Sequence, residues 1–179
     1  MNKRSFCGIL ITLACSHLAF CGEIHDAARD GDLVKVKTLL KDNPDLVFSK
    51  DIDGKTPLHW AVMHDRMDAA NFLLTQKANV NAKEKTGLTP LHWAAMKCFR
   101  DMAELLLSKK AEVNSRSIDG RTPLDWAAAQ DCKDVAELLL ANKAKVNVKT
   151  YNGFTPLHTA LFFGHTNLVN LLRQHGARE

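Results

Sequence analysis

Residues Gly54-Lys-Thr-Pro-Leu-His-Trp-Ala61 decide the fold of this chain, because the same eight-position pattern returns at a fixed interval. It recurs as Gly87-Leu-Thr-Pro-Leu-His-Trp-Ala94, Gly120-Arg-Thr-Pro-Leu-Asp-Trp-Ala127 and Gly153-Phe-Thr-Pro-Leu-His-Thr-Ala160. The four glycines are 33 residues apart, and the copies align without gaps. A fixed period of this length is typical of a repeat protein, in which one supersecondary unit stacks on the next.

Each copy reads locally as two helices joined by a turn. Thr56 can cap the first helix, and Pro57 then takes the first helical position, where no amide donor is needed. Ala61, Leu73 and Leu74 supply apolar faces at helical spacing. Leucine-rich runs stand at the same place in every copy: Phe72-Leu-Leu74, Leu105-Leu-Leu107, Leu138-Leu-Leu140 and Leu171-Leu172. No unit can bury its apolar face alone, so the pattern predicts a stack with a continuous core.

Further positions repeat around this motif. Three copies close with Ala-x-Val-Asn, at Ala78 to Asn81, Ala111 to Asn114 and Ala144 to Asn147. A degenerate copy precedes them, with His25-Asp-Ala-Ala28, Gly31 and Leu39-Leu40. Period, motif and order together resemble the ankyrin repeat, whose T-P-L-H-x-A core is nearly complete here. The resemblance implies an all-α ankyrin-repeat solenoid of about five helix-turn-helix repeats with short β-hairpin-like finger loops.

We expect one repeat domain over residues 22–179, with repeats one to five at about 23–53, 54–86, 87–119, 120–152 and 153–179. Two positions depart from the ankyrin pattern, which places glycine at the turn between the helices and before the closing alanine. The turn carries Asp65, Cys98 and Asp131, and the second position carries Lys77, Lys110 and Lys143. If these lysines adopt the left-handed backbone conformation, each costs about 1 kcal/mol relative to glycine.

Residues 1–21 lie outside the repeat and read as a signal peptide. Lys3 and Arg4 give a basic start, residues 6–20 are mostly apolar, and Ala19-Phe20-Cys21 resembles a cleavage site. Leu18-Ala-Phe-Cys21 also resembles a bacterial lipoprotein box, in which Cys21 would be lipidated, and Thr12-Leu-Ala-Cys15 is a weaker candidate. An uncleaved anchor is the third alternative. Each alternative places the repeat domain outside the cytoplasm, and the combination resembles exported, periplasmic or secreted, bacterial ankyrin proteins.

Composition favours one ordinary globular domain without nucleic acid as a partner. The chain has 179 residues, a hydrophobic content of 46% and a formal charge of +4, which falls to +2 without Lys3 and Arg4. That balance is no electrostatic footprint for nucleic acid, and no run of like charges suggests a membrane surface. We expect a monomer without a cofactor or a metal ion.

Cys98 and Cys132 are the two cysteines beyond residue 21, and the sequence favours two unpaired thiols. They fall at the interhelical turns of adjacent repeats, one position out of register. Export would permit a disulfide, but neighbouring repeats are expected to hold the two α-carbons near or beyond the bridging limit of roughly 7 Å.

Nothing in the sequence favours an enzyme. The resemblance implies that His59, His92 and His158 hydrogen-bond between neighbouring repeats, and one histidine per repeat is too widely spaced to share one metal ion. Asp125 replaces this histidine in the fourth repeat and, when ionised, can accept but not donate a hydrogen bond. Trp60, Trp93 and Trp126 are expected to fill the stack. His64 is the nearest candidate base for Cys98, and the pair is disfavoured.

The resemblance implies that a partner meets the finger tips and the adjoining first helices. There the copies differ from one another while the motif stays constant. The residues at these positions form the predicted partner-binding set: Lys55, Met63, His64, Lys83, Lys85, Leu88, Met96, Lys97, Arg116, Ile118, Arg121, Gln130, Lys149, Tyr151, Phe154, Phe162 and Phe163. The set is rich in lysine, arginine, methionine and aromatic residues, and interface cores favour arginine, methionine and aromatic residues. It predicts a protein partner with an acidic surface and apolar pockets.

Two functions follow from these observations. The first is an exported, non-enzymatic module that binds another protein through the finger and first-helix face. The alternative is a lipid-anchored envelope scaffold or assembly protein tethered at Cys21. The sequence does not identify the partner in either case.

Overall fold

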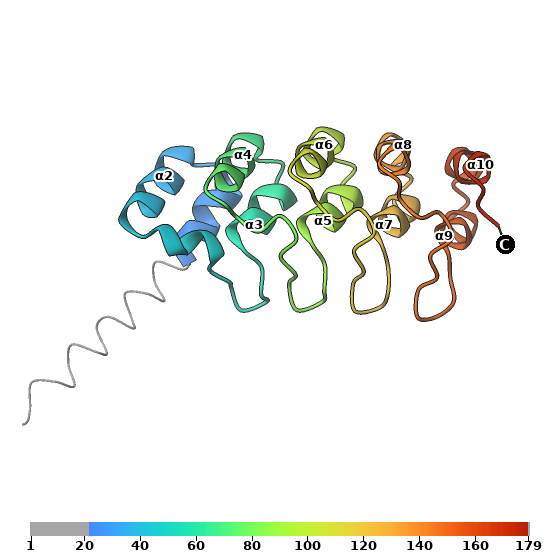
Figure 1. Cartoon of the computed structure of the whole chain (residues 1–179), viewed down its shortest axis with the longest axis horizontal. Coiled ribbons are helices and arrows are strands. Elements are labelled where there is room, and N and C mark those ends of the chain that lie inside the picture. Colours follow the sequence, from blue (N-terminus) through green and yellow to red (C-terminus); the bar gives the residue numbers. More distant parts are fainter. Residues whose placement is uncertain (1–21, 179) are drawn as a thin grey trace, which may run out of the picture.

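The computed structural model describes residues 22–178. The predicted signal segment, residues 1–21, lies outside the described residues, and with it lie Cys15 and Cys21. Within 22–178 the chain contains helices, turns and no strand, as the predicted solenoid requires. Figure 1 shows two rows of helices above a row of loops, which all point the same way.

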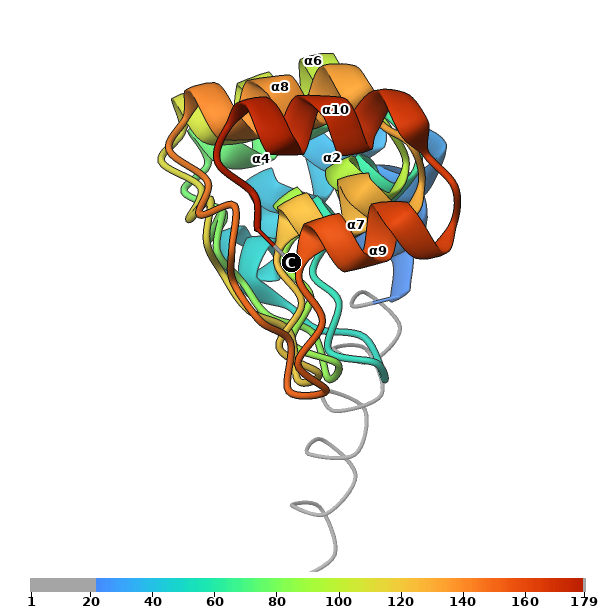
Figure 2. The same ribbon diagram turned by 90° about the vertical axis from the view of Figure 1, so that its right-hand side faces the viewer.

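The inner row contains the first helix of each repeat. It begins with helical residues 22–30 and continues with α3 (Pro57–Met63), α5 (Pro90–Met96), α7 (Pro123–Ala129) and α9 (Pro156–Phe162). The outer row contains the second helices, α2 (Leu33–Asp42), α4 (Met67–Thr75), α6 (Arg100–Ser108), α8 (Lys133–Ala141) and α10 (Thr166–Gln174). A 3₁₀ helix, η1 (Pro44–Phe48), leads from the first repeat to the second. Figure 2 shows α10 lying along α9 and the fingers extending beyond the inner row.

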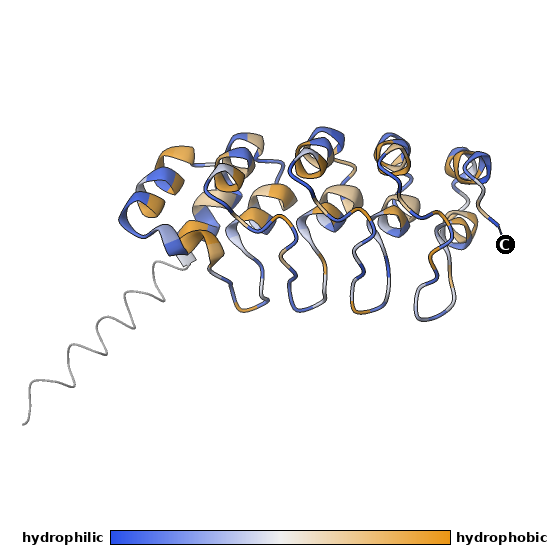
Figure 3. Cartoon of the chain, viewed as in Figure 1, coloured by the Kyte–Doolittle hydropathy of each residue, from blue (hydrophilic) through white to orange (hydrophobic). Residues whose placement is uncertain are grey.

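Each inner helix begins as its sequence predicts. The motif threonine is the N-cap, the proline follows at the first helical positions, and a capping box closes on the third helical residue. Both helices of a repeat carry apolar and polar residues (Figure 3), and apolar residues of the faces between them, such as Leu58, Leu73 and Leu106, are fully buried. The core therefore continues from repeat to repeat along the whole array.

The fingers are the loops 49–55, 82–88, 115–121 and 148–154, and each is tied to the next by a backbone hydrogen bond. Lys85 donates to the Asp53 carbonyl at 2.8 Å, and Ile118 donates to that of Thr86 at 2.9 Å. The motif glycine permits this close approach, because a Cβ at Gly87 would lie 2.9 Å from the Ile118 nitrogen. Its φ of 77° also favours glycine. The glycine period thus reflects both a turn and a contact between repeats.

The closing asparagines also join neighbouring repeats. The side-chain amide of Asn81 donates to the Lys110 carbonyl at 3.4 Å, and its oxygen accepts from Glu112 at 2.8 Å. Asn114 and Asn147 bind the following repeat in the same two ways. One asparagine therefore satisfies two backbone groups across each joint, which explains why it recurs in Ala-x-Val-Asn.

A disulfide joins Cys98 and Cys132, so the expectation of two unpaired thiols was wrong. The two α-carbons are 5.1 Å apart, inside the bridging range. The sequence had led us to expect that neighbouring repeats hold the two α-carbons near or beyond roughly 7 Å. Cys98 occupies the turn between α5 and α6, whereas Cys132 lies one residue past the equivalent turn, where the chain enters α8. That offset brings the two residues within reach.

The left-handed positions are those that the sequence suggested. Asp65, Cys98 and Asp131 have φ between 55° and 58°, and the lysines before the closing alanines have φ of 67° or 68°. Six side chains therefore occupy a backbone region that glycine adopts without strain.

Replacing Lys110 by glycine is expected to stabilise the domain by about 0.5–1 kcal/mol, since relief of the left-handed strain exceeds the added entropy of the unfolded chain. The midpoint of thermal unfolding, followed by circular dichroism, should rise. Lys109 is the matched control, because it precedes Lys110 and has φ of −94°. Lys109→Gly should lower the midpoint, and a lower midpoint in Lys110→Gly would contradict the strain argument.

Reducing the disulfide is expected to destabilise the domain by about 3–4 kcal/mol, because the bridge closes a loop with a sequence separation of 34. Urea unfolding with and without a phosphine reductant measures this difference. Cys98→Ser/Cys132→Ser should unfold identically with and without the reductant. A non-reduced mass that shows two free thiols would contradict the bridge.

Candidate functional site

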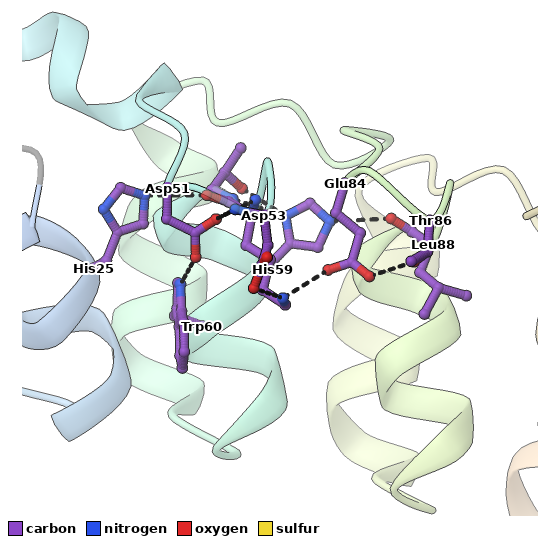
Figure 4. Close-up of polar contacts among 10 residues, drawn as sticks. His25, Asp51, Asp53, His59, Trp60, Glu84, Thr86 and Leu88 are labelled. Carbon is purple, nitrogen blue, oxygen red and sulfur yellow. Dashed lines mark hydrogen bonds and ion pairs between the residues drawn. The ribbon is translucent and has the colours of Figure 1, made fainter.

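Two motif histidines, His59 and His92, connect their repeat to the next, as the resemblance implied. The third, His158, bonds within its own repeat to Thr155 and not to a neighbouring repeat. The Nδ1 atom of His59 accepts from the Thr56 amide at 3.1 Å, so its Nε2 carries the proton and lies 3.3 Å from the Leu88 carbonyl. His92 meets the Arg121 carbonyl in the same way at 3.2 Å. Figure 4 shows His59 between its own loop and the next finger. Burial lowers the pKa of His59 and of His92 to about 4, which keeps both rings neutral.

The joint between repeats four and five lacks this bond. Asp125 Oδ2 accepts from the amide and hydroxyl of Thr122, both at 2.8 Å, but Oδ1 is buried without a hydrogen-bond partner. The Phe154 carbonyl corresponds to those of Leu88 and Arg121, but it accepts no hydrogen bond from a motif histidine. Burial raises the pKa of Asp125 to about 6, so above that pH the joint contains an incompletely satisfied carboxylate.

Several predicted partner-binding residues hold the fingers together. Lys83 donates to the Arg116 carbonyl at 2.8 Å, and Arg116 donates to that of Lys149 at 2.7 Å. The ammonium group of Lys55 lies 3.0 Å from Asp53 and 3.5 Å from Glu84, and its side chain is only 13% exposed. Figure 4 shows Glu84 reaching back from the next finger. These three side chains still contribute charge, but their polar groups are already engaged between repeats.

The other predicted residues divide by exposure. Leu88 is only 7% exposed and must be removed from the set, because so little of its side chain is accessible to a partner. The half-buried members are Met63, Met96 and Arg121. The exposed members are His64, Lys85, Lys97, Ile118, Gln130, Lys149, Tyr151, Phe154, Phe162 and Phe163. Together these side chains cover the fingers and the free side of the inner row, a surface that we call the concave face.

The tryptophan ladder has a mainly architectural role. Trp60 donates to Asp51 at 2.9 Å and stacks on His64 with ring centroids 5.9 Å apart. Trp93 and Trp126 pack against the core, and their indole nitrogens are buried without a hydrogen-bond partner. Arg121 lies 4.9 Å above the Trp126 ring, which fixes its guanidinium group on the concave face.

A hollow of about 230 Å³ on the concave face unites four of the predicted residues, Arg121, Phe154, Phe162 and Phe163. It spans the joint between repeats four and five. The sequence reasoning missed the remaining lining residues, which are Asp119, Thr150, Asn152, His158 and Thr159. Three of them, Asp119, Thr150 and Asn152, lie in fingers, and that location could have indicated them. No signal in the sequence indicated His158, because the equivalent His59 and His92 are fully buried in the earlier repeats.

Histidine and acidic residues do not gather into a metal site in the described chain. Between residues 22 and 178, no group of three His, Cys, Asp or Glu side chains could hold a metal ion. No helix in the same range is both long and apolar enough to cross a membrane.

Two-helix repeats, stacked fingers and histidine-linked joints define a solenoid protein with one elongated concave face. The comparison with known families agrees. Residues 24–117, 74–150 and 115–179 match ankyrin repeats in three copies, so the chain belongs to the ankyrin repeat family. Ankyrin repeats generally mediate protein–protein interactions and are typically not enzymatic.

Curated relatives match about a third of the chain. The chain is 40% identical over 58 residues to a probable 26S proteasome regulatory subunit p28 of Saccharomyces cerevisiae, which covers 32% of this chain and 25% of that protein. It is 40% identical over 58 residues to the serine/threonine-protein kinase VIK of Arabidopsis thaliana, covering 32% of this chain and 13% of the kinase. It is 41% identical over 63 residues to the palmitoyltransferase AKR1 of Naumovozyma castellii, covering 35% and 8%. The chain therefore spans a quarter or less of these relatives.

Replacing Asp125 by histidine should restore the missing bond and stabilise the domain by about 1–2 kcal/mol at pH 7.5, because the new ring can donate to the Phe154 carbonyl. The gain should shrink as the pH falls to 5. The raised pKa of Asp125 makes its contribution most favourable at low pH and least favourable above about 6. A buried histidine has the opposite dependence, with stability lost below its unfolded pKa. Urea unfolding at both pH values measures the gain.

His92→Asp is the matched control at an intact joint, and it should lose stability at pH 7.5. If Asp125→His destabilised the domain at pH 7.5, the two joints would not be equivalent.

Proposed function

We propose that this chain is a non-enzymatic binding module that acts outside the cytoplasm and engages another protein through its concave face. One observation carries the proposal. The frame of the array, which is its finger backbones and closing asparagines, makes the same contacts from repeat to repeat, whereas the concave face differs from copy to copy and exposes aromatic side chains. Selection for packing alone accounts for the frame and not for exposed aromatics.

Charge supports the nature of the partner. The fingers of repeats two to four contain Lys83, Lys85, Arg116, Arg121 and Lys149 against Glu84 and Asp119. Their excess of positive charge favours an acidic partner surface and speeds its approach. The half-buried Met63 and Met96 supply adaptable apolar contacts between these charges.

The disulfide supports action outside the cytoplasm. Bridges such as Cys98–Cys132 form and persist in oxidising compartments and are rare where thiols are kept reduced. This agrees with the signal-like residues 1–21. The alternative, a scaffold tethered through a lipidated Cys21, places the same face in the same compartment and differs only in the anchor.

Two findings support a non-enzymatic role. The sulfur of Cys98 is bonded to Cys132, so it is not available as a thiolate nucleophile. The rings of His59 and His92 are buried, neutral and occupied in joints between repeats. The groups best suited to chemistry thus serve the fold.

Photo-crosslinking tests the binding face. A benzophenone amino acid in place of Met63 or Met96 of the full chain, expressed in its native cell, should yield adducts with the same partner protein. In place of Glu104 or Glu137, which are exposed on the outer row, it should yield none. Adducts formed only from the outer row would overturn the proposed face.

Alkaline phosphatase fused after residue 179 tests export, because this enzyme needs an oxidising compartment to form its disulfides. Activity is expected with residues 1–21 present and not without them. Globomycin sensitivity would identify the lipid-anchored alternative. An inactive full-length fusion would remove the export part of the proposal and leave the binding face standing.

A further inference from the structure

Exposed large apolar side chains gather around repeat five. Within residues 22–178, nine such side chains are exposed. Four of them belong to repeat five, namely Phe154, Leu161, Phe162 and Phe163, and a fifth, Tyr151, lies in the finger that leads into it. Phe162 alone is 81% exposed. An apolar cluster of this kind is uncommon on a protein that stays alone in water.

Comparison with the other repeats shows that Leu161 is exposed for a different reason than Phe162 and Phe163. Leu161 stands where the preceding repeats have Val62, Ala95 and Ala128, which are fully buried under the following repeat. Its exposure follows from its place in the array. Phe162 and Phe163 stand where the preceding repeats have Met63 and His64, Met96 and Lys97, and Ala129 and Gln130. These positions border the concave face in every repeat, so the frame does not require an aromatic ring there.

The rings around the hollow are already held in place. Phe162 and Phe163 meet edge to face with centroids 5.1 Å apart, and Phe163 stacks on His165 at 5.8 Å. Phe154 meets the His158 ring edge-on at 6.2 Å. The Nδ1 atom of His158 is fixed by the Thr155 hydroxyl at 2.7 Å. A ligand that enters the hollow therefore orders few side chains, which lowers the entropic cost of binding.

Size and charge indicate what fits. The hollow of about 230 Å³ is smaller than typical small-molecule sites of roughly 300–1,000 Å³ and suits a single large side chain. Arg121 stands at its edge, with Nε 3.1 Å from Asp119 and its side chain 37% exposed. The guanidinium group has further N–H donors that can meet a carboxylate.

We propose that the hollow formed by Arg121, Phe154, Phe162 and Phe163 is the anchor site for a partner polypeptide, taking one large apolar side chain that is flanked by carboxylates. This inference rests on the proposed binding function and specifies where the partner is recognised. The apolar side chain packs against the phenylalanine rings, and a flanking carboxylate pairs with Arg121. The basic fingers of repeats two to four attract the rest of the acidic segment.

A peptide array tests the site with the full chain as the probe. The immobilised 13-residue peptides have Phe, Leu, Trp or Ala at the centre and acidic, basic or uncharged flanks. Binding is expected for large apolar centres with acidic flanks. In fluorescence anisotropy, the acidic Phe peptide should bind at least tenfold more tightly than its Ala counterpart. Absence of binding to every peptide, or a preference for basic flanks, would overturn the proposal.

Substitutions test separately the apolar contact with the phenylalanine rings and the charge contact with Arg121. Phe162→Ala/Phe163→Ala should lose at least tenfold in affinity for the acidic Phe peptide. Ile52→Ala, which truncates an 86% exposed side chain on the first finger, should lose nothing. Arg121→Gln should remove the preference for acidic over uncharged flanks and keep the preference for Phe over Ala. Circular dichroism verifies that each variant is folded, and equal affinities of the double variant and wild type would refute the site.

Sedimentation of the full chain examines a second copy as the occupant. A dimer that Phe162→Ala/Phe163→Ala converts to a monomer would show that the hollow serves self-association, which would overturn the proposal. Crosslinking from Met63 and Met96 is independent of the hollow. A partner captured there without any peptide binding would remove the anchor site and preserve the proposed function.

Discussion

The hydrogen bond from a motif histidine to the carbonyl of the next finger sets the spacing on which the array depends. The same ring accepts from its own N-cap threonine and donates across the joint, so one residue both begins a helix and places the following repeat. A repeat cannot bury its apolar face alone, so the stack depends on the contacts that join successive repeats. The asparagine, glycine and finger-lysine contacts reinforce the spacing that this bond defines.

The frame could be predicted from the sequence because each of its residues has a local or periodic reason to be there. Thr56 and Pro57 indicate a helix start, the 33-residue period indicates stacking, and the lysines before the closing alanines are left-handed as suggested. The disulfide could not be predicted in this way. Whether Cys98 reaches Cys132 depends on a one-residue offset between two packed turns, and periodicity gives the repeat spacing without the positions of individual backbone atoms.

The candidate site was predictable in outline and not in detail for the same reason. Repeat position correctly indicated the exposed Phe162, but it could not distinguish an available side chain from one already bound. Lys55 pairs with Asp53 and with Glu84 of the next finger, and Leu88 is buried. The contact between Lys55 and Glu84 joins two copies of the repeat at positions where one copy differs from the next. The same differences between copies that indicate a binding face also create contacts that the pattern cannot foresee.

The two joints beside the hollow differ in strength, and this bears on how binding would act on the array. The bridge between Cys98 and Cys132 secures repeats three and four, whereas Asp125 leaves repeats four and five without the histidine bond. Removing a disulfide costs about 2–5 kcal/mol and an unsatisfied buried group about 1–3 kcal/mol, so the joint of repeats four and five is weaker than the bridged joint of repeats three and four. The hollow draws its lining from both sides of that joint. A ligand that needs both sides stabilises the docked arrangement by its own binding free energy. Occupation of the hollow and attachment of repeat five are therefore thermodynamically coupled.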